Sequence, residues 1–182
     1  MWKACDAMDV LETCRLVLSE MSAGDYPALC EILQDPLVMY AYEGAFSDAE
    51  VAAWLEKQLC RYDEHGFGLW AVRLKETGEM VGQCGLTMQD WNGRQVLEVG
   101  YLLKRSHWHR GYATEAATGC IAYAFDVLGV AEVCSIIRDT NLPSQRVAAR
   151  VGMKKVDGIM IKHYRGIDMP HYLYVRHGTA VK

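Results

Sequence analysis

The stretch that decides the fold reads VLEVGYLLKRSHWHRGYATEAATGCIAYAFDVLG and covers residues 96–129. It opens on an apolar run typical of a strand. From Ala113 onward, apolar residues recur at steps of three and four, the period of an amphipathic helix. A short basic loop that contains Gly111 lies between the two patterns. The stretch therefore predicts a strand, a glycine-containing loop and a long helix, which Gly129 is well placed to end.

The flanking sequence extends this pattern in both directions through alternating apolar runs, two serine-led capping boxes and an Asn-Gly turn. The predicted strands cover residues 13–20, 68–75, 80–89, 96–103, 132–138, 153–161 and 171–176. The predicted helices cover residues 22–33, 47–64, 111–128 and 141–150. The order is β-α-α-β-β-β-α-β-α-β-β, which indicates an α+β domain with one long crossover helix.

Composition and charge exclude several functional classes. Hydrophobic residues make up 51% and charged residues 23% of the chain, which fits one soluble domain over residues 1–182 with its core at about residues 11–176. The net charge of −4 argues against nucleic acid as a partner, because nucleic-acid-binding domains usually present a basic face. No apolar run approaches the roughly 20 residues of a membrane span. The N-terminus carries no secretory signal.

The seven cysteines predict free thiols rather than disulfides or a metal site. Their number is odd, no CxxC pair occurs, and most lie inside apolar runs. Such thiols fit a reducing cytoplasm. His107 and His109 flank a tryptophan, but they stand in a loop with no nearby thiol or carboxylate ligand, so we expect no metal.

The loop that carries Gly111 has the character of an anion site. The first N–H groups of a helix have no partner within it and carry the positive end of its dipole, so a phosphate or diphosphate is their natural occupant. Gly111 allows a close approach of the backbone, and Arg105, His109 and Arg110 add positive charge. Many helix starts carry a glycine and bind nothing, so this alternative stays open. The loop matches neither GxxxxGK[ST] nor GxGxxG, which argues against an ATPase or a dehydrogenase.

Two segments resemble the motifs of the GNAT superfamily of N-acetyltransferases. WHRGYATEA, residues 108–116, resembles the acyl-CoA motif Q/R-x-x-G-x-G/A, although Trp108 stands where that pattern has Gln or Arg. RDTNLPSQRVAARVGM, residues 138–153, resembles the second motif of that superfamily. Residues 11–18 and 68–70 resemble the ribosomal-protein-alanine (RimJ/RimL-type) branch.

The resemblance implies a fold and a cofactor. The fold is the GNAT fold, a mixed, mostly antiparallel sheet of about seven strands with about four helices. The co-substrate is acetyl-CoA, and the partner is an amine acceptor. Main-chain groups of Leu102 and Leu103 should pair with the pantetheine arm, and Asn141 and Ser144 should lie beside pantetheine and the thioester sulfur. The diphosphate should be held by the N–H groups of His109, Arg110, Gly111, Tyr112, Ala113 and Thr114.

Glu98 is the predicted general base. It is the one acid within the apolar run VLEVGYLL, and alternation places it on the same face as Gly100, which leaves space beside the carboxylate. Burial there would raise its pKa. The alternative is a strand-edge glutamate paired with an arginine. Ser144 is the candidate acid, since Ala148 occupies the position of the tyrosine that many related enzymes use. A helix-start serine without that role is the alternative, and a thiolate leaving group needs no acid at all.

The acceptor side is less well defined by the sequence. Tyr40, Tyr42 and Glu43 form a loop whose aromatics and carboxylate suit a protonated amine, although loop packing explains them equally well. The branch resemblance favours a protein N-terminal α-amine. A small-molecule amine and a non-catalytic acyl-CoA-binding protein are the alternatives. Related proteins are monomers or homodimers, and we expect the same here.

Overall fold

The computed structural model describes residues 8–42, 44–164 and 166–178. Its first half contains β1 (Asp9–Glu12), β2 (Leu16–Ser19), η1 (Ala23–Asp25), α1 (Tyr26–Leu33), η2 (Met39–Ala41), α2 (Asp48–His65), β3 (Leu69–Leu74), β4 (Met80–Trp91) and β5 (Arg94–Leu103). Its second half contains η3 (Arg105–His107), α3 (Tyr112–Asp126), β6 (Glu132–Arg138), α4 (Leu142–Arg150), β7 (Lys154–Lys155), β8 (Met160–Tyr164) and β9 (Ile167–His177). The α+β class and the four α-helices are confirmed.

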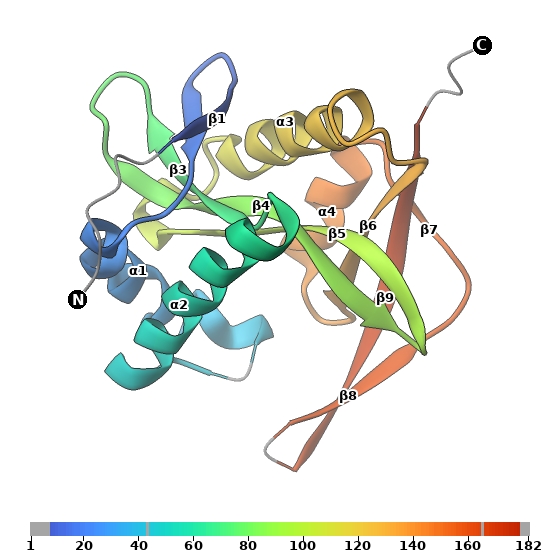
Figure 1. The fold of residues 1–182 in the computed structure, drawn as a ribbon. Coiled ribbons are helices and arrows are strands. Elements are labelled where there is room, and N and C mark those ends of the chain that lie inside the picture. The colour runs from blue at the N-terminus through green and yellow to red at the C-terminus, as the bar shows by residue number, and fades with distance from the viewer. Residues whose placement is uncertain (1–7, 43, 165, 179–182) are drawn as a thin grey trace.

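One sheet runs through the molecule in the order β1-β2-β3-β4-β5-β6-β9-β7, with β8 paired to β9 (Figure 1). Only the β5–β6 pair is parallel among the described strands, so the mostly antiparallel character is confirmed. Within the described residues the sheet has nine strands rather than about seven. The short β1 precedes the first predicted strand. The run at 153–161 divides into β7 and β8, because Gly158 at φ +117° breaks the extended conformation between them.

The three consecutive predicted strands at 68–75, 80–89 and 96–103 are confirmed as β3, β4 and β5, which pair as an antiparallel meander. Its second turn has Asn92 at φ +52° and Gly93 at φ +86°. Positive φ at both central residues is the geometry that lets a two-residue hairpin follow the right-handed twist of its strands. β4 and β5 then pair without interruption from Trp91–Arg94 to Gly82–Leu103, which makes β5 a rigid support for the residues that it carries.

Helices cover both faces of the sheet (Figure 1). Alternate residues of β3 point to opposite faces: Trp70 packs in the core with α3 and α4, and Ala71 packs in the core with α1 and α2. Ser47 and Glu50 form the predicted capping box of α2, and the second predicted box precedes α1 through a 3-10 turn. No helix of the described segments is long and apolar enough to span a membrane.

Candidate active site

The sheet splits between β5 and β6. Their parallel pairing consists of one position, Glu98 opposite Cys134. Beyond it, side chains replace the ladder: the Ser135 hydroxyl donates to the Val99 carbonyl at 2.8 Å, and Glu98 Oε1 accepts from the Ile136 N–H at 2.9 Å. Since β5 remains paired with β4 and β6 with β9 to their carboxyl ends, a gap opens between these two inner strands.

Main-chain groups of β5 line this gap. The Val99 carbonyl faces β6, whereas the Lys104 N–H donates to the Val81 carbonyl of β4 at 2.9 Å. Because main-chain groups alternate along a strand, those of Tyr101 and Leu103 face the gap and those of Leu102 face β4. The Leu103 carbonyl also accepts from Trp108 Nε1 at 3.0 Å. Both Leu102 and Leu103 were predicted to pair with pantetheine. The main chain of Leu103 faces the gap, whereas the main chain of Leu102 faces β4 and its side chain packs in the core.

The loop after β5 forms a concave turn of backbone N–H groups. His109 has φ +61° and Gly111, the N-cap residue of α3, has φ +81°. No side chain caps this helix. The leading N–H groups of α3, those of Tyr112, Ala113 and Thr114, are thus left for an external acceptor. Left-handed residues next to a helix start make an anion-binding nest, and the helix dipole adds positive potential.

The basic side chains of this loop differ in their surroundings. Arg105 Nε lies 3.1 Å from Asp35 Oδ2, and His107 is buried, with Nε2 3.7 Å from Glu79 Oε2. His109 and Arg110 remain exposed. Across residues 8–42, 44–164 and 166–178, no three His, Cys, Asp or Glu side chains are arranged to hold a metal ion.

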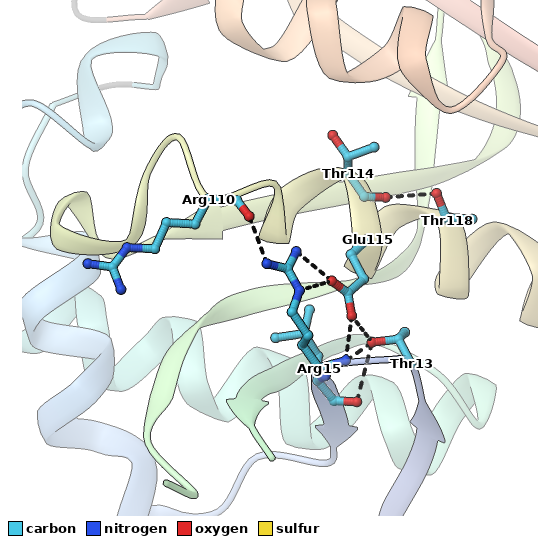
Figure 2. Close-up of polar contacts among 7 residues, drawn as sticks. Thr13, Arg15, Arg110, Thr114, Glu115 and Thr118 are labelled. Atoms are coloured by element: carbon cyan, nitrogen blue, oxygen red, sulfur yellow. Dashed lines mark hydrogen bonds and ion pairs between the residues drawn. The ribbon is translucent and has the colours of Figure 1, made fainter. Parts of the chain in front are cut away.

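The β1–β2 turn holds the loop from the other side (Figure 2). Glu115 Oε1 accepts from the Thr13 hydroxyl at 2.6 Å and from the Arg15 N–H at 2.7 Å, and Glu115 Oε2 accepts from Arg15 Nε at 2.7 Å. Partial burial alone would raise the pKa of Glu115, but these hydrogen bonds and the Arg15 charge hold it below its usual range. This network was not predicted from the sequence. Its one local signal is an acid in the first turn of α3, where the helix dipole favours negative charge.

Glu98 lies at the closed end of the gap, half-buried. Burial raises its pKa, while the Ile136 N–H and the charges of Lys162 and Arg61 oppose the rise. No described basic group lies within ion-pair distance of Glu98, and Arg61 donates instead to Gln58 Oε1 at 3.0 Å. A Cβ added at Gly100 would contact only Leu69, at 3.8 Å, so there is open space next to the carboxylate.

The start of α4 connects the gap to the acceptor loop. Asn141 Oδ1 accepts from the Ser144 N–H at 3.2 Å and from the Tyr40 hydroxyl at 2.9 Å. The Ser144 carbonyl accepts from the Tyr101 hydroxyl at 3.1 Å. Ala148 is buried and offers no proton. The structure therefore brings together Asn141 and Ser144, predicted for the cofactor, with Tyr40, predicted for the acceptor.

Tyr42, the second predicted acceptor residue, lies in the same loop as Tyr40. The Tyr42 side chain is 38% exposed, but burial of its hydroxyl and the nearby Glu98 charge raise its pKa. Glu43, the third predicted acceptor residue, lies outside the described residues. On β9, His171 is buried with Nδ1 2.8 Å from the Met169 carbonyl, and burial lowers its pKa. An open groove between α2 and the β4–β5 hairpin passes Arg61.

Comparison with known proteins agrees with this geometry. The model of the acetyltransferase (GNAT) domain family matches residues 15–154. The protein YkkB of Bacillus subtilis (strain 168) is 35% identical over 149 residues, which cover 81% of this chain and 87% of YkkB. The FsC-acetyl coenzyme A-N(2)-transacetylase of Aspergillus fumigatus is 31% identical over 168 residues, which cover 86% of this chain and 70% of that enzyme. Apo RimL, a ribosomal L7/L12 α-N-protein acetyltransferase, shares the fold with a TM-score of 0.77 at 15% identity, over 94% of each chain.

Proposed function

This chain belongs to the GNAT acetyltransferase family, and from that premise we propose that it transfers the acetyl group of acetyl-CoA to a primary amine beside Glu98. The observation that carries the proposal is the split between β5 and β6. An anion nest lies past its open end at Gly111, and a carboxylate with a raised pKa lies at its closed end. In a matching donor, a diphosphate would occupy the nest, an extended amide arm would lie in the split, and a reactive terminus would lie beside the carboxylate.

The residues present fit acetyl-CoA as the donor. The N–H groups from His109 to Thr114 would hold the diphosphate, and the main chain of Tyr101 and Leu103 would pair with the pantetheine amides as an added strand does. Asn141 would contact the arm from the start of α4. When bound, acetyl-CoA supplies an acetyl group activated as a thioester. The name of the Aspergillus fumigatus relative, which contains acetyl coenzyme A and N(2), supports the same donor and a nitrogen acceptor.

Glu98 is the proton acceptor in this proposal. An amine must lose a proton to form an amide, and a base whose pKa is raised toward the working pH does this best. The open space above Gly100 gives the amine, or a water between them, access to the carboxylate. Direct attack in a ternary complex also draws on placement, because holding two reactants in line can remove roughly 7–11 kcal/mol of barrier.

No described side chain occupies the usual position of a general acid, because Ala148 stands there. The Ser144 hydroxyl at the start of α4 is the candidate donor, and it would stabilise the departing sulfur by a hydrogen bond. A thiolate has a pKa near 8.5 on the cysteine scale, so it leaves without full protonation. The proposed chemistry therefore needs one strong base and at most one weak donor.

We propose a protein N-terminal α-amine as the acceptor. Its pKa is about 7.7–8.0, against about 10.4 for a lysine side chain, so far more of it is neutral near pH 7. A single carboxylate base can deprotonate an α-amine acceptor more easily than it can deprotonate a lysine acceptor. The open groove beside Arg61, whose charge acts on Glu98, would give a peptide acceptor room. The free thiols at Cys84, Cys120 and Cys134 fit an enzyme of the reducing cytoplasm.

A thiol-release assay with three acceptor classes tests the proposal. We expect turnover of acetyl-CoA with short peptides that carry a free α-amine, and much slower turnover with the same peptides when they are N-terminally blocked and offer one lysine. Faster turnover with a small polyamine or amino-acid derivative would move the acceptor to the small-molecule class. CoA binding by calorimetry without turnover of any amine would identify a non-catalytic acyl-CoA-binding protein instead.

A further inference from the structure

We propose that Arg15 is a positioning residue for the donor: it fixes the orientation of the loop at residues 109–112 so that the loop N–H groups point toward the diphosphate. The inference rests on the proposed function, since it concerns how the same site holds its cofactor. Arg15 lies in the β1–β2 turn, about a hundred residues away in sequence from the helix that it contacts. Thr13 and Glu115 complete the network (Figure 2).

Arg15 contacts three consecutive residues of the loop. Its Nη1 donates to the Arg110 carbonyl at 3.0 Å, and its guanidinium carbon lies 4.5 Å from the centre of the Tyr112 ring. Its Nη2 lies 3.4 Å from the place that a Cβ on Gly111 would occupy. One planar side chain thus contacts the carbonyl before the left-handed Gly111 and the aromatic ring after it, and lies beside Gly111 itself.

The bond to the Arg110 carbonyl determines where the next N–H points. The carbonyl of Arg110 and the N–H of Gly111 belong to one planar trans peptide, in which the two groups point in opposite directions. Because Arg15 holds the carbonyl toward the β1–β2 turn, the Gly111 N–H is directed away from that turn. In the proposed complex the diphosphate lies on that side, where it would also meet the N–H groups at the uncapped start of α3.

The Arg15 side chain is itself held in place. Glu115 Oε2 accepts from Arg15 Nε at 2.7 Å, and the same oxygen lies 2.7 Å from Arg15 Nη2. The Arg15 carbonyl accepts from the Lys75 N–H at 2.9 Å at the end of β3. Leu16, the next residue, is fully buried. A fixed backbone and two guanidinium nitrogens on one carboxylate oxygen restrict the orientation of the guanidinium, as a positioning role requires.

Comparison of a full and a truncated donor tests the proposal. Acetyl-pantetheine has the reactive thioester and the amide arm of acetyl-CoA but no diphosphate. With a peptide acceptor, we expect Arg15→Gln to lower kcat/KM for acetyl-CoA roughly 10-fold, because a charge-assisted hydrogen bond is lost, and to leave kcat/KM for acetyl-pantetheine unchanged. Because the Arg15 side chain is 46% exposed, its ion pair contributes little to stability and the variant should fold. For Arg15→Lys, which keeps one donor group, kcat/KM for acetyl-CoA should lie between the values for wild type and Arg15→Gln.

Lys75→Gln is the matched control. Lys75 Nζ lies 2.7 Å from Glu12 Oε2 across the same turn, and none of the described contacts of this side chain involves α3. We expect kcat/KM of this variant for acetyl-CoA and for acetyl-pantetheine to equal the wild-type values. Equal losses with acetyl-CoA and acetyl-pantetheine in Arg15→Gln, or no loss with either, would overturn the positioning role. If wild-type protein fails to bind CoA in calorimetry, the proposed function fails instead, so the two outcomes are distinguishable.

Discussion

The two sides of the candidate site use different parts of the chain for recognition. The donor side, formed by the end of β5, the loop at residues 104–111 and the start of α3, presents main-chain groups fixed by the sheet and by Arg15. The acceptor side, formed by the loop around Tyr40 and Tyr42, the second half of α2 and the β8–β9 hairpin, presents exposed side chains. A diphosphate and an amide arm are the same in every acetyl-CoA molecule, so rigid backbone recognises them well. An acceptor varies, and side chains on loops adapt to it.

The two sides meet at two hydrogen bonds. Tyr40 donates to Asn141 Oδ1, and the Ile136 N–H donates to Glu98 Oε1. The first bond joins the loop around Tyr40 to the start of α4, and the second joins β5 to the splayed strand β6. Catalysis in the proposed enzyme depends on this junction, because the amine and the thioester must meet there. The predictions below change one side at a time and measure whether the other responds.

Removing the base should have the largest effect. We expect Glu98→Gln to lower kcat about 10²–10⁴-fold, because proton transfer by a positioned base typically contributes that much. KM for acetyl-CoA should stay within about twofold, since the donor side is untouched. The measurement is a steady-state assay with an N-terminal peptide. Undiminished kcat across the pH range would remove Glu98 from the mechanism.

The next largest effect should come from the donor loop. Gly111 has φ +81°, and a residue with a side chain pays roughly 1–2 kcal/mol in that conformation. We expect Gly111→Ala to raise KM for acetyl-CoA about 10-fold as the loop relaxes away from it, with kcat at saturation little changed. Gly78, in the β3–β4 turn, has φ +71° and free space around it. Gly78→Ala should therefore lose similar stability and keep its KM; a matching rise in KM would show that general destabilisation explains both variants.

The same division explains what the sequence could predict. The turn at Asn92–Gly93, the strand β6 and the helix α4 depend on residues close together in the chain, and all three are confirmed. The nest at Gly111 was also predicted from local signals, a glycine and a helix start. A site built from main-chain groups leaves such signals in the sequence, because its backbone conformation requires particular residue types at particular positions.

Contacts between distant segments left no comparable signal. The pairs Arg15–Glu115 and Tyr40–Asn141 join residues 100 and 101 positions apart. The split of the sheet arises because Ser135 and Glu98 side chains replace the ladder hydrogen bonds, and neither residue type indicates this alone. The alternation of main-chain groups, which assigns Leu103 to the gap and Leu102 to β4, also depends on knowing which strands are neighbours.

A smaller effect should follow from loosening the junction itself. Tyr40 is 42% exposed, and its hydroxyl donates to Asn141 Oδ1 at 2.9 Å. Since a hydrogen bond near the surface contributes at the low end of about 0.5–1.5 kcal/mol, we expect Tyr40→Phe to raise KM for acetyl-CoA about 2–3-fold. The Tyr26 hydroxyl donates to the Asp48 carbonyl far from this site, so Tyr26→Phe is the control. An altered acceptor KM with an unchanged acetyl-CoA KM would place Tyr40 wholly on the acceptor side.

The smallest effect concerns stability, and it has the opposite sign to the loss of activity. Burial raises the pKa of Glu98 in the folded chain above its unfolded value, against the opposing influence of Ile136, Lys162 and Arg61. Between those two pKa values the folded chain binds more protons, so wild-type stability falls as the pH rises through that window. The amide in Glu98→Gln still accepts from Ile136 and does not titrate. We therefore expect a higher Tm than wild type near pH 8 and a shrinking difference toward pH 4, measured by thermal unfolding. A variant less stable than wild type near pH 8 would mean that the carboxylate is not disfavoured by its surroundings, and the argument for its basicity would fail with it.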